Sequence, residues 1–258
     1  METTGQFNLR QQPEIIELFQ VLEENELVKE HQEVELLVDY LEGIESQFGQ
    51  MLEELKAVRG QLSQIQDKGV KATAVRIVEK AEGKVQEIGS QITTMKENLH
   101  HSAQNAIITF KEIGVGALKK AVSAMKIPSV LFVLKESFHS GMESMNKNAT
   151  KIAIISGEIH EAREHTKNIG RVLFGRGTKE PNPHSPDKGV TAKLKNVFLS
   201  CGIKFADMEH ATESVIQKLE QMESKKSKKP SVRAEIRRLK KEKTVISQIT
   251  IPTKEEVR

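Results

Sequence analysis

The stretch Val34–Ile65, VELLVDYLEGIESQFGQMLEELKAVRGQLSQI, decides the fold class of this chain. Its apolar residues recur at alternating spacings of three and four, which is the heptad pattern of packed helices. Val38, Tyr40 and Leu52 beside this seam are also apolar, so the apolar face is wider than a two-stranded coiled coil needs. A face of this width predicts a helix in a multi-helix bundle. The seam consists of Val34, Leu37, Leu41, Ile44, Phe48, Met51, Leu55, Val58, Leu62 and Ile65.

A second seam follows a candidate turn at Asp67–Gly69 and runs from Val78 to Ala117. Its phase shifts by one residue between Leu99 and Ala103, which we interpret as a local stutter within one helix. Pro128 is expected to stop or kink that helix, because proline removes a backbone donor and clashes with the preceding turn.

Two further seams extend from Leu131 to Leu173 and from Leu194 to Met222, and a short amphipathic helix with Pro13 in its first turn precedes all four seams.

The amino-acid composition also favours a helical protein. The 258 residues include no Trp and 4% aromatic residues, and Glu far outnumbers Asp. Glu favours helix interiors, whereas Asp favours caps and turns.

We therefore predict an all-α protein, an elongated antiparallel helical bundle or coiled coil of long helices with a short basic C-terminal helix. The expected segments are a short N-terminal helix in 1–30, a long-helix coiled-coil bundle in 31–175, a Pro/Gly linker in 176–189, a further bundle helix in 190–223 and a basic tail in 224–258. The pattern leaves open whether the seams close within one chain or between copies in a homo-oligomer.

The N-terminus lacks a signal-peptide pattern, and the longest strongly apolar run, Ile127–Leu134, is far shorter than the roughly 20 residues that span a bilayer. We expect a cytoplasmic location. Charge is unevenly distributed: the segment Lys225–Lys243 holds ten basic residues and two glutamates, so the rest of this +3 chain is acidic.

The basic residues of the tail are candidate contacts for nucleic-acid phosphates or for a protein partner. No aromatic residue lies between Met222 and Arg258, so base stacking is unavailable there. A solvated, solubilising tail is the alternative. The candidate residues are Lys225, Lys226, Lys228, Lys229, Arg233, Arg237, Arg238, Lys240, Lys241 and Lys243.

Three motifs resemble catalytic or metal sites without meeting their requirements. Gly170–Thr178, GRVLFGRGT, has the outline of a phosphate-binding P-loop, but Arg176 and Gly177 replace its Lys and Ser/Thr, and a helical seam precedes it instead of a strand. We interpret it as a helix that ends at a glycine. His160 and His165 are five residues apart, so they diverge by about 140° around a helix. Cys201 lies on an apolar seam. We predict no catalytic, cofactor-binding or metal-binding residues, no cofactor and no enzymatic activity.

The segments Glu24–Leu55, Lys167–Gly175 and Lys228–Lys243 together resemble an uncharacterised family of long-helical coiled-coil proteins. That family is encoded on integrative and conjugative elements of Gram-positive, largely gut, bacteria. The resemblance covers most of the chain and implies no activity and no site residues.

We therefore expect a non-enzymatic structural or adaptor protein of a bacterial mobile genetic element. Its helical surfaces would bind protein partners, and its basic tail would contact nucleic acid or a partner in the transfer machinery. The alternative is a membrane-surface or membrane-active helical protein, suggested by the apolar stretch Ile113–Leu134. Lys119, Lys120 and Lys126 within that stretch count against insertion.

Overall fold

The computed structural model of this chain describes residues 8–65, 67–181 and 189–227. The chain divides into two compact units, Met1–Ile216 and Gln217–Arg258. Only the end of the last helix is described in the second unit, so the architecture below is that of the first.

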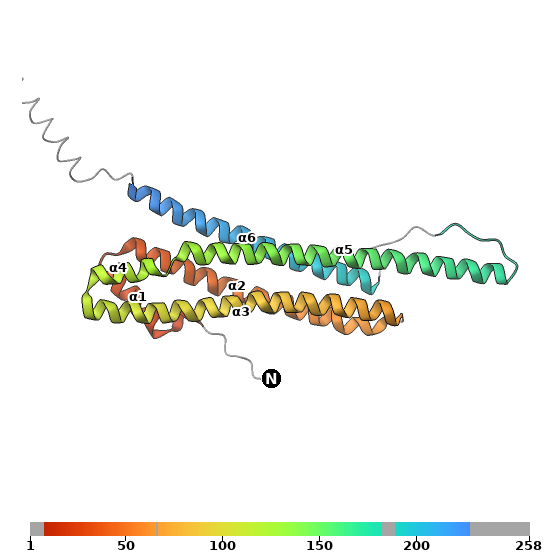
Figure 1. Ribbon diagram of the computed structural model, residues 1–258, viewed down its shortest axis with the longest axis horizontal. Helices are drawn as coiled ribbons and strands as arrows, with labels where there is room; N and C mark the ends of the chain where they lie inside the picture. Colours follow the sequence, from red (N-terminus) through yellow and green to blue (C-terminus); the bar gives the residue numbers. More distant parts are fainter. Residues whose placement is uncertain (1–7, 66, 182–188, 228–258) are drawn as a thin grey trace, which may run out of the picture. The chain divides into compact units, whose positions relative to one another are not determined.

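The described secondary structure is entirely helical, which confirms the predicted all-α class. Figure 1 shows the order of the elements along the chain. They are η1 (Leu9–Gln11), α1 (Pro13–Glu24), α2 (Val28–Gln61), η2 (Leu62–Gln64), α3 (Lys68–Ile113), α4 (Val115–Ala124), α5 (Ile127–Leu173) and α6 (Val190–Ser227).

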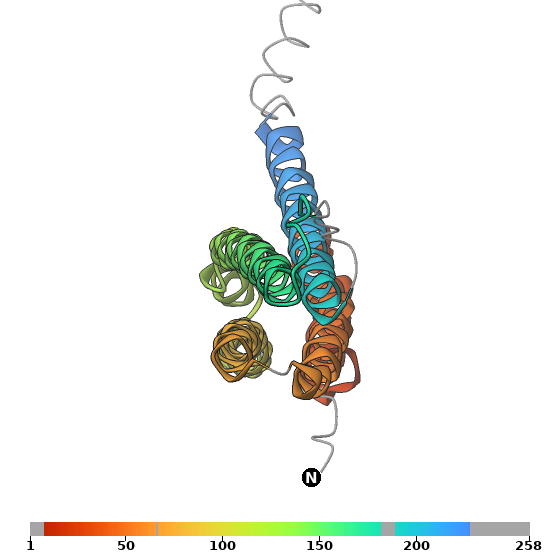
Figure 2. The same ribbon diagram turned by 90° about the vertical axis from the view of Figure 1, so that its right-hand side faces the viewer.

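The four longest helices of the first unit form an antiparallel bundle. Glu45 on α2 pairs with Lys96 on α3, and Arg59 on α2 pairs with Glu82 on α3, each at 2.7 Å. The residue numbers of the partners rise along α2 while they fall along α3, so the two helices are antiparallel. Seen end-on in Figure 2, α3 lies beside α2 and α5, and α6 lies across from α3. The same reversal appears in the pairs His139–Glu209 and Ser156–Thr191 between α5 and α6, and in Tyr40–Thr212 and Glu54–Lys204 between α2 and α6.

The predicted seams form the core of the bundle. All nine seam residues of α2 and η2, from Val34 to Leu62, are buried, and so are the flanking Val38 and Tyr40, whereas Ile65 follows η2 and is half-buried. Phe48 joins three helices at the centre: its ring centroid lies 6.3 Å from that of Phe138 on α5 and 5.9 Å from that of Phe205 on α6. The wide apolar face therefore packs against several helices at once, as the sequence predicted.

The turn before α3 lies slightly earlier than the predicted Asp67–Gly69. Asp67 is the N-cap of α3, and its carboxylate accepts hydrogen bonds from the backbone N–H groups of Gly69 and Val70 at 2.9 and 3.0 Å. Because these bonds satisfy donors of the first helical turn, the helix already begins at Lys68.

The interpretation of the α3–α5 region needs a correction. The helix is continuous through Leu99–Ala103, so the stutter is confirmed, but it does not run on to Pro128. It ends at Ile113 because Gly114 adopts a positive φ of 96°, which glycine reaches at little cost. Pro128 lies instead in the first turn of α5, where its missing N–H costs no hydrogen bond.

Candidate functional site

The end of α5 extends past the helices that cover the rest of it. Ser156 on α5 still bonds to Thr191 near the start of α6, with their hydroxyls 3.0 Å apart. Beyond that contact, Figure 1 shows α5 continuing without a neighbouring helix. The third seam was predicted as one continuous packing face, and its first half, from Leu131 to Ile152, is buried except for the half-buried Met142. Its last members are not: Ile169 is 62% exposed and Leu173 is 79% exposed.

Val172 and Phe174 extend this exposed surface, with exposed fractions of 57% and 84%. We call Ile169, Val172, Leu173 and Phe174 the apolar end of α5. Contiguous exposed apolar side chains mark interaction surfaces more often than singly scattered ones do. The end of α5 is therefore the strongest candidate for a binding surface on the described part of the chain.

The helix ends at Leu173 and is followed by a glycine in the cap, as the sequence predicted. Gly175 has φ 70°, and its N–H donates to the carbonyl of Val172 at 2.9 Å. The N–H of Arg176 donates to the carbonyl of Arg171 at 2.8 Å. This pair of bonds is a Schellman motif, in which a left-handed glycine satisfies the last carbonyls of a helix.

The residues after Gly175 fold back along α5. The side chain of Asn168 donates to the carbonyl of Lys179 at 2.9 Å and accepts from its N–H at 3.0 Å. Arg171 donates from Nε to the carbonyl of Gly177 at 2.9 Å. These bonds fix the GRVLFGRGT stretch in a helix-to-loop turn. A P-loop has the opposite order, from strand through loop to helix N-terminus.

Cys201 lies in the core of the bundle. Cys201 is fully buried, and burial raises the pKa of its thiol to about 12. A thiol held in this neutral form is a weak nucleophile. Among the described residues, no group of three or more His, Cys, Asp or Glu side chains could hold a metal ion.

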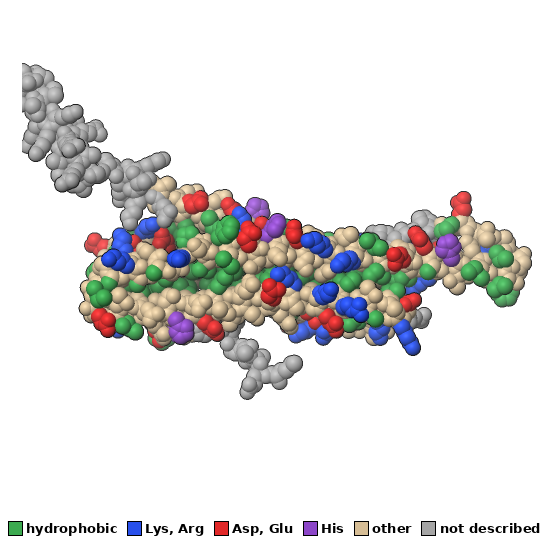
Figure 3. All heavy atoms as spheres, viewed as in Figure 1, with side chains coloured by type: hydrophobic (Ala, Val, Ile, Leu, Met, Phe, Trp, Pro, Cys, Tyr) green, Lys and Arg blue, Asp and Glu red, His purple; other side chains and the backbone are tan. Residues whose placement is uncertain are grey.

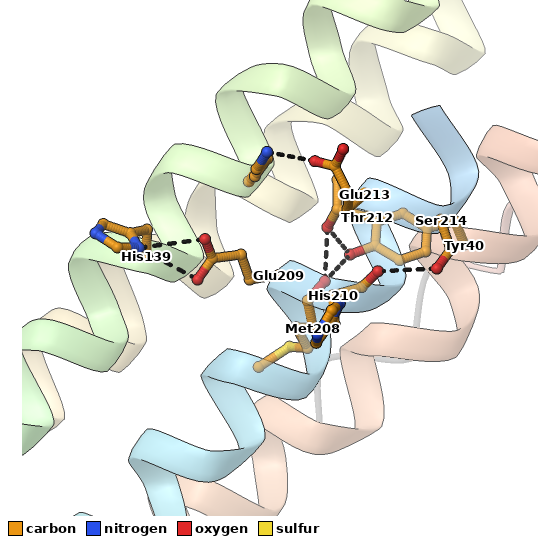
Figure 4. Close-up of polar contacts among 9 residues, drawn as sticks. Tyr40, His139, Met208, Glu209, His210, Thr212, Glu213 and Ser214 are labelled. Carbon is orange, nitrogen blue, oxygen red and sulfur yellow. Dashed lines mark hydrogen bonds and ion pairs between the residues drawn. The ribbon is translucent and has the colours of Figure 1, made fainter. Parts of the chain in front are cut away.

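Polar contacts attach α6 to its neighbours, as Figure 4 shows. The hydroxyl of Tyr40 on α2 donates to the carbonyl of Met208 at 3.0 Å and contacts the hydroxyl of Thr212. Burial raises the pKa of Tyr40 to about 12. On the α5 side, His139 lies 3.2 Å from Glu209, and Lys135 pairs with Glu213. These contacts position helices, and a structural role explains all of them.

The predicted tail contacts lie almost entirely outside the described residues. Lys225 and Lys226 belong to the last turn of α6. The other eight, namely Lys228, Lys229, Arg233, Arg237, Arg238, Lys240, Lys241 and Lys243, lie beyond the described range.

The exposure of the apolar end was not predicted. Ile169 and Leu173 keep the heptad spacing of the buried seam, so the pattern alone does not separate a covered from an uncovered stretch. The only sequence signal was the lengthening of the third seam relative to its partners. None of the described helices is both long enough and apolar enough to cross a membrane.

The fold and this surface define a helical bundle protein with an exposed apolar helix end. Residues 11–257 match a family of unknown function, DUF6674. Because this match covers nearly the whole chain, the protein belongs to that family. No curated protein and no solved structure matches the chain.

Proposed function

We propose that this protein is a non-enzymatic adaptor that docks a protein partner on the apolar end of α5. The observation that carries the proposal is the exposure of four large apolar side chains at a helix end that is capped and held by its own loop. A surface that is already ordered loses little conformational entropy on binding.

The charges around the apolar end indicate the chemistry of the partner. Arg171, Arg176 and Lys179 fall within or beside it, and the segment 168–179 contains no carboxylate, whereas Lys167 is paired with Glu164. A partner with an apolar groove rimmed by acidic side chains would complement this surface. We assign the protein to a bacterial mobile genetic element on the three segments that resemble such proteins, and we propose that its basic tail contacts nucleic acid or a partner in the transfer machinery.

An affinity pull-down from the native host tests the docking surface. Full-length protein carrying Leu173→Glu should lose a partner that the unmodified protein retains, because a carboxylate would be buried against an apolar and acidic surface. Ile203→Glu is the matched control, since Ile203 is 63% exposed on α6 and lies outside the apolar end. Identical sets of captured proteins for the two variants would contradict the proposal.

A second candidate function is binding to a membrane surface. The apolar end with its nearby cations also suits an anionic lipid headgroup region. Flotation with vesicles containing phosphatidylserine separates the two functions. Flotation that is lost in Leu173→Glu and kept in Ile203→Glu would favour the membrane, whereas no flotation favours a protein partner.

A further inference from the structure

A groove between α3 and α5 gathers positive charge well away from the apolar end. Its volume is about 330 Å³, and α3 contributes Lys80 and Lys84 to its lining, while α5 contributes Lys147 and Lys151. Each pair has i, i+4 spacing, which places both side chains on one face of its helix. Figure 3 shows Lys and Arg side chains on both helices along this face of the bundle.

The lysines of the groove are only partly neutralised. Lys147 lies 3.4 Å from Glu143, which also lines the groove, and Lys84 lies 3.2 Å from Glu87. Within the described part of the chain, neither Lys80 nor Lys151 has a carboxylate at ion-pair distance. Four cations around one small groove repel one another, and a bound anion would relieve that repulsion.

A buried amide lies among these charges. Asn148 lines the groove, is only 6% exposed, and its Nδ2 has no hydrogen-bond partner. Two other buried polar atoms of the described residues also lack a partner, Gln61 Oε1 and Glu82 Oε1, but neither residue lines the groove. Buried amide donors are nearly always paired in folded proteins, so an unpaired donor at a cationic groove points to a ligand acceptor.

We propose that this groove binds a small oligophosphate, meaning two or more linked phosphate groups carried by inorganic polyphosphate or by a nucleotide. Lysine is a common phosphate ligand, and lysines on both walls would hold neighbouring phosphates. The hydroxyls of Ser140 and Ser144, which also line the groove, are further donors for phosphate oxygens. The volume lies at the lower end of the range for small-molecule sites, which suits a ligand of this size. This site is separate from the docking surface and the tail, and it does not depend on the proposed function.

Isothermal titration calorimetry on the full-length protein tests the proposal with inorganic triphosphate and with ATP as probes. We expect saturable binding that weakens about tenfold or more when Lys80→Ala and Lys151→Ala are combined, since two phosphate-facing charges are lost. The matched control combines Lys56→Ala and Lys120→Ala, two exposed lysines outside the groove lining. All variants keep the basic tail, so tail binding cannot produce a difference between them.

Asn148→Leu removes the buried donor at similar volume and should weaken binding severalfold. Equal affinity for the two probes assigns the site to free oligophosphate, and tighter binding of ATP assigns it to a nucleotide; both outcomes support an oligophosphate site. The proposal is overturned if neither probe binds, or if the groove variants and the control bind equally. Circular dichroism melts confirm that each variant is folded.

Discussion

Gly141 shows how closely α5 and α6 pack. A Cβ atom built at this position would lie 2.9 Å from three ring atoms of Phe205, which is itself fully buried. The ring cannot move away without disturbing Phe48, whose centroid is 5.9 Å from its own. Glycine at position 141 is therefore required by the contact between two helices, although it weakens the helix in which it lies.

We predict that Gly141→Ala destabilises the bundle. The added methyl group should cost about 1–3 kcal/mol by overpacking, against a gain of roughly 1 kcal/mol in helix propensity. Urea unfolding followed by circular dichroism measures the net change. Gly83→Ala is the matched control, because Gly83 lies within α3 and a Cβ there meets nothing within 4 Å. It should stabilise the protein by up to about 1 kcal/mol. Equal changes in the free energy of unfolding for the two substitutions would show that the close contact between Gly141 and Phe205 does not affect stability.

The burial of Lys96 was not predicted from the sequence. It is 1% exposed, and its Nζ lies 2.7 Å from Glu45 and 3.2 Å from Glu42 on α2. A lysine next to a heptad position is ordinarily assigned to the solvated edge of a helix. Its burial depends on two carboxylates from another helix. The burial could therefore be predicted only if the pairing of α2 with α3 were known. Seam positions such as Val85 and Ile88 could be predicted because they depend only on local spacing.

At the scale of elements, α1 is held against α3 by a polar cluster. His100 Nε2 lies 2.8 Å from Glu14, and the side-chain amide of Gln104 donates to the same carboxylate at 2.9 Å. The contact with His100, followed by the one with Gln104, lowers the pKa of Glu14 from 4.5 to about 2. The ionised carboxylate is thus favoured in the folded state.

We predict that this cluster weakens in acid. Because the pKa of Glu14 is lower in the folded protein, its contribution to stability is complete above about pH 4.5 and is lost as the pH falls toward about 2. Unfolding free energies of the unmodified protein and of Glu14→Gln should differ at neutral pH and converge across that range. Urea titrations at several pH values give both. A difference between the two proteins that does not change with pH would contradict the assigned cause of the shift.

The boundaries of elements were predictable where a residue imposes its own conformation. Gly175 ends α5 through the left-handed cap that the sequence indicated. Gly114 also ends a helix at a positive φ, with a backbone different from that of Gly175, but the apolar spacing through Phe110 and Ile113 obscured it. Periodicity describes which residues could share a face. It does not show where the chain stops being helical, so local glycine and proline chemistry has to decide.

At the scale of the whole molecule, the sequence did not predict which helices pack against one another. Lys80 and Lys84 are more than sixty residues from Lys147 and Lys151 in the chain, and they line one groove only because α3 packs beside α5. Four amphipathic helices can be arranged in several ways with the same buried faces. The fold class therefore follows from the heptads, while the groove and the uncovered end of α5 follow from the particular pairing and from unequal helix lengths.

The basic tail is the remaining large-scale feature, and we predict that it carries any contact with duplex DNA. Full-length protein should retard duplex DNA in a gel at low salt, because ten basic residues concentrated in one segment displace the counterions that are condensed on DNA phosphates. Affinity should fall steeply as salt rises, with little dependence on base sequence, since the segment contains no aromatic residue for stacking.

Truncation after Met222 removes every one of these basic residues and retains the buried seam of α6 from Leu194 to Leu219. The truncated protein should therefore keep its melting temperature while losing DNA retardation. The melting temperature is the control that separates loss of contacts from loss of fold. If both forms retard DNA equally, the contact lies on the bundle. If neither form does so at low ionic strength, the tail serves a partner protein or solubility, because a segment with ten basic residues would bind DNA phosphates under those conditions.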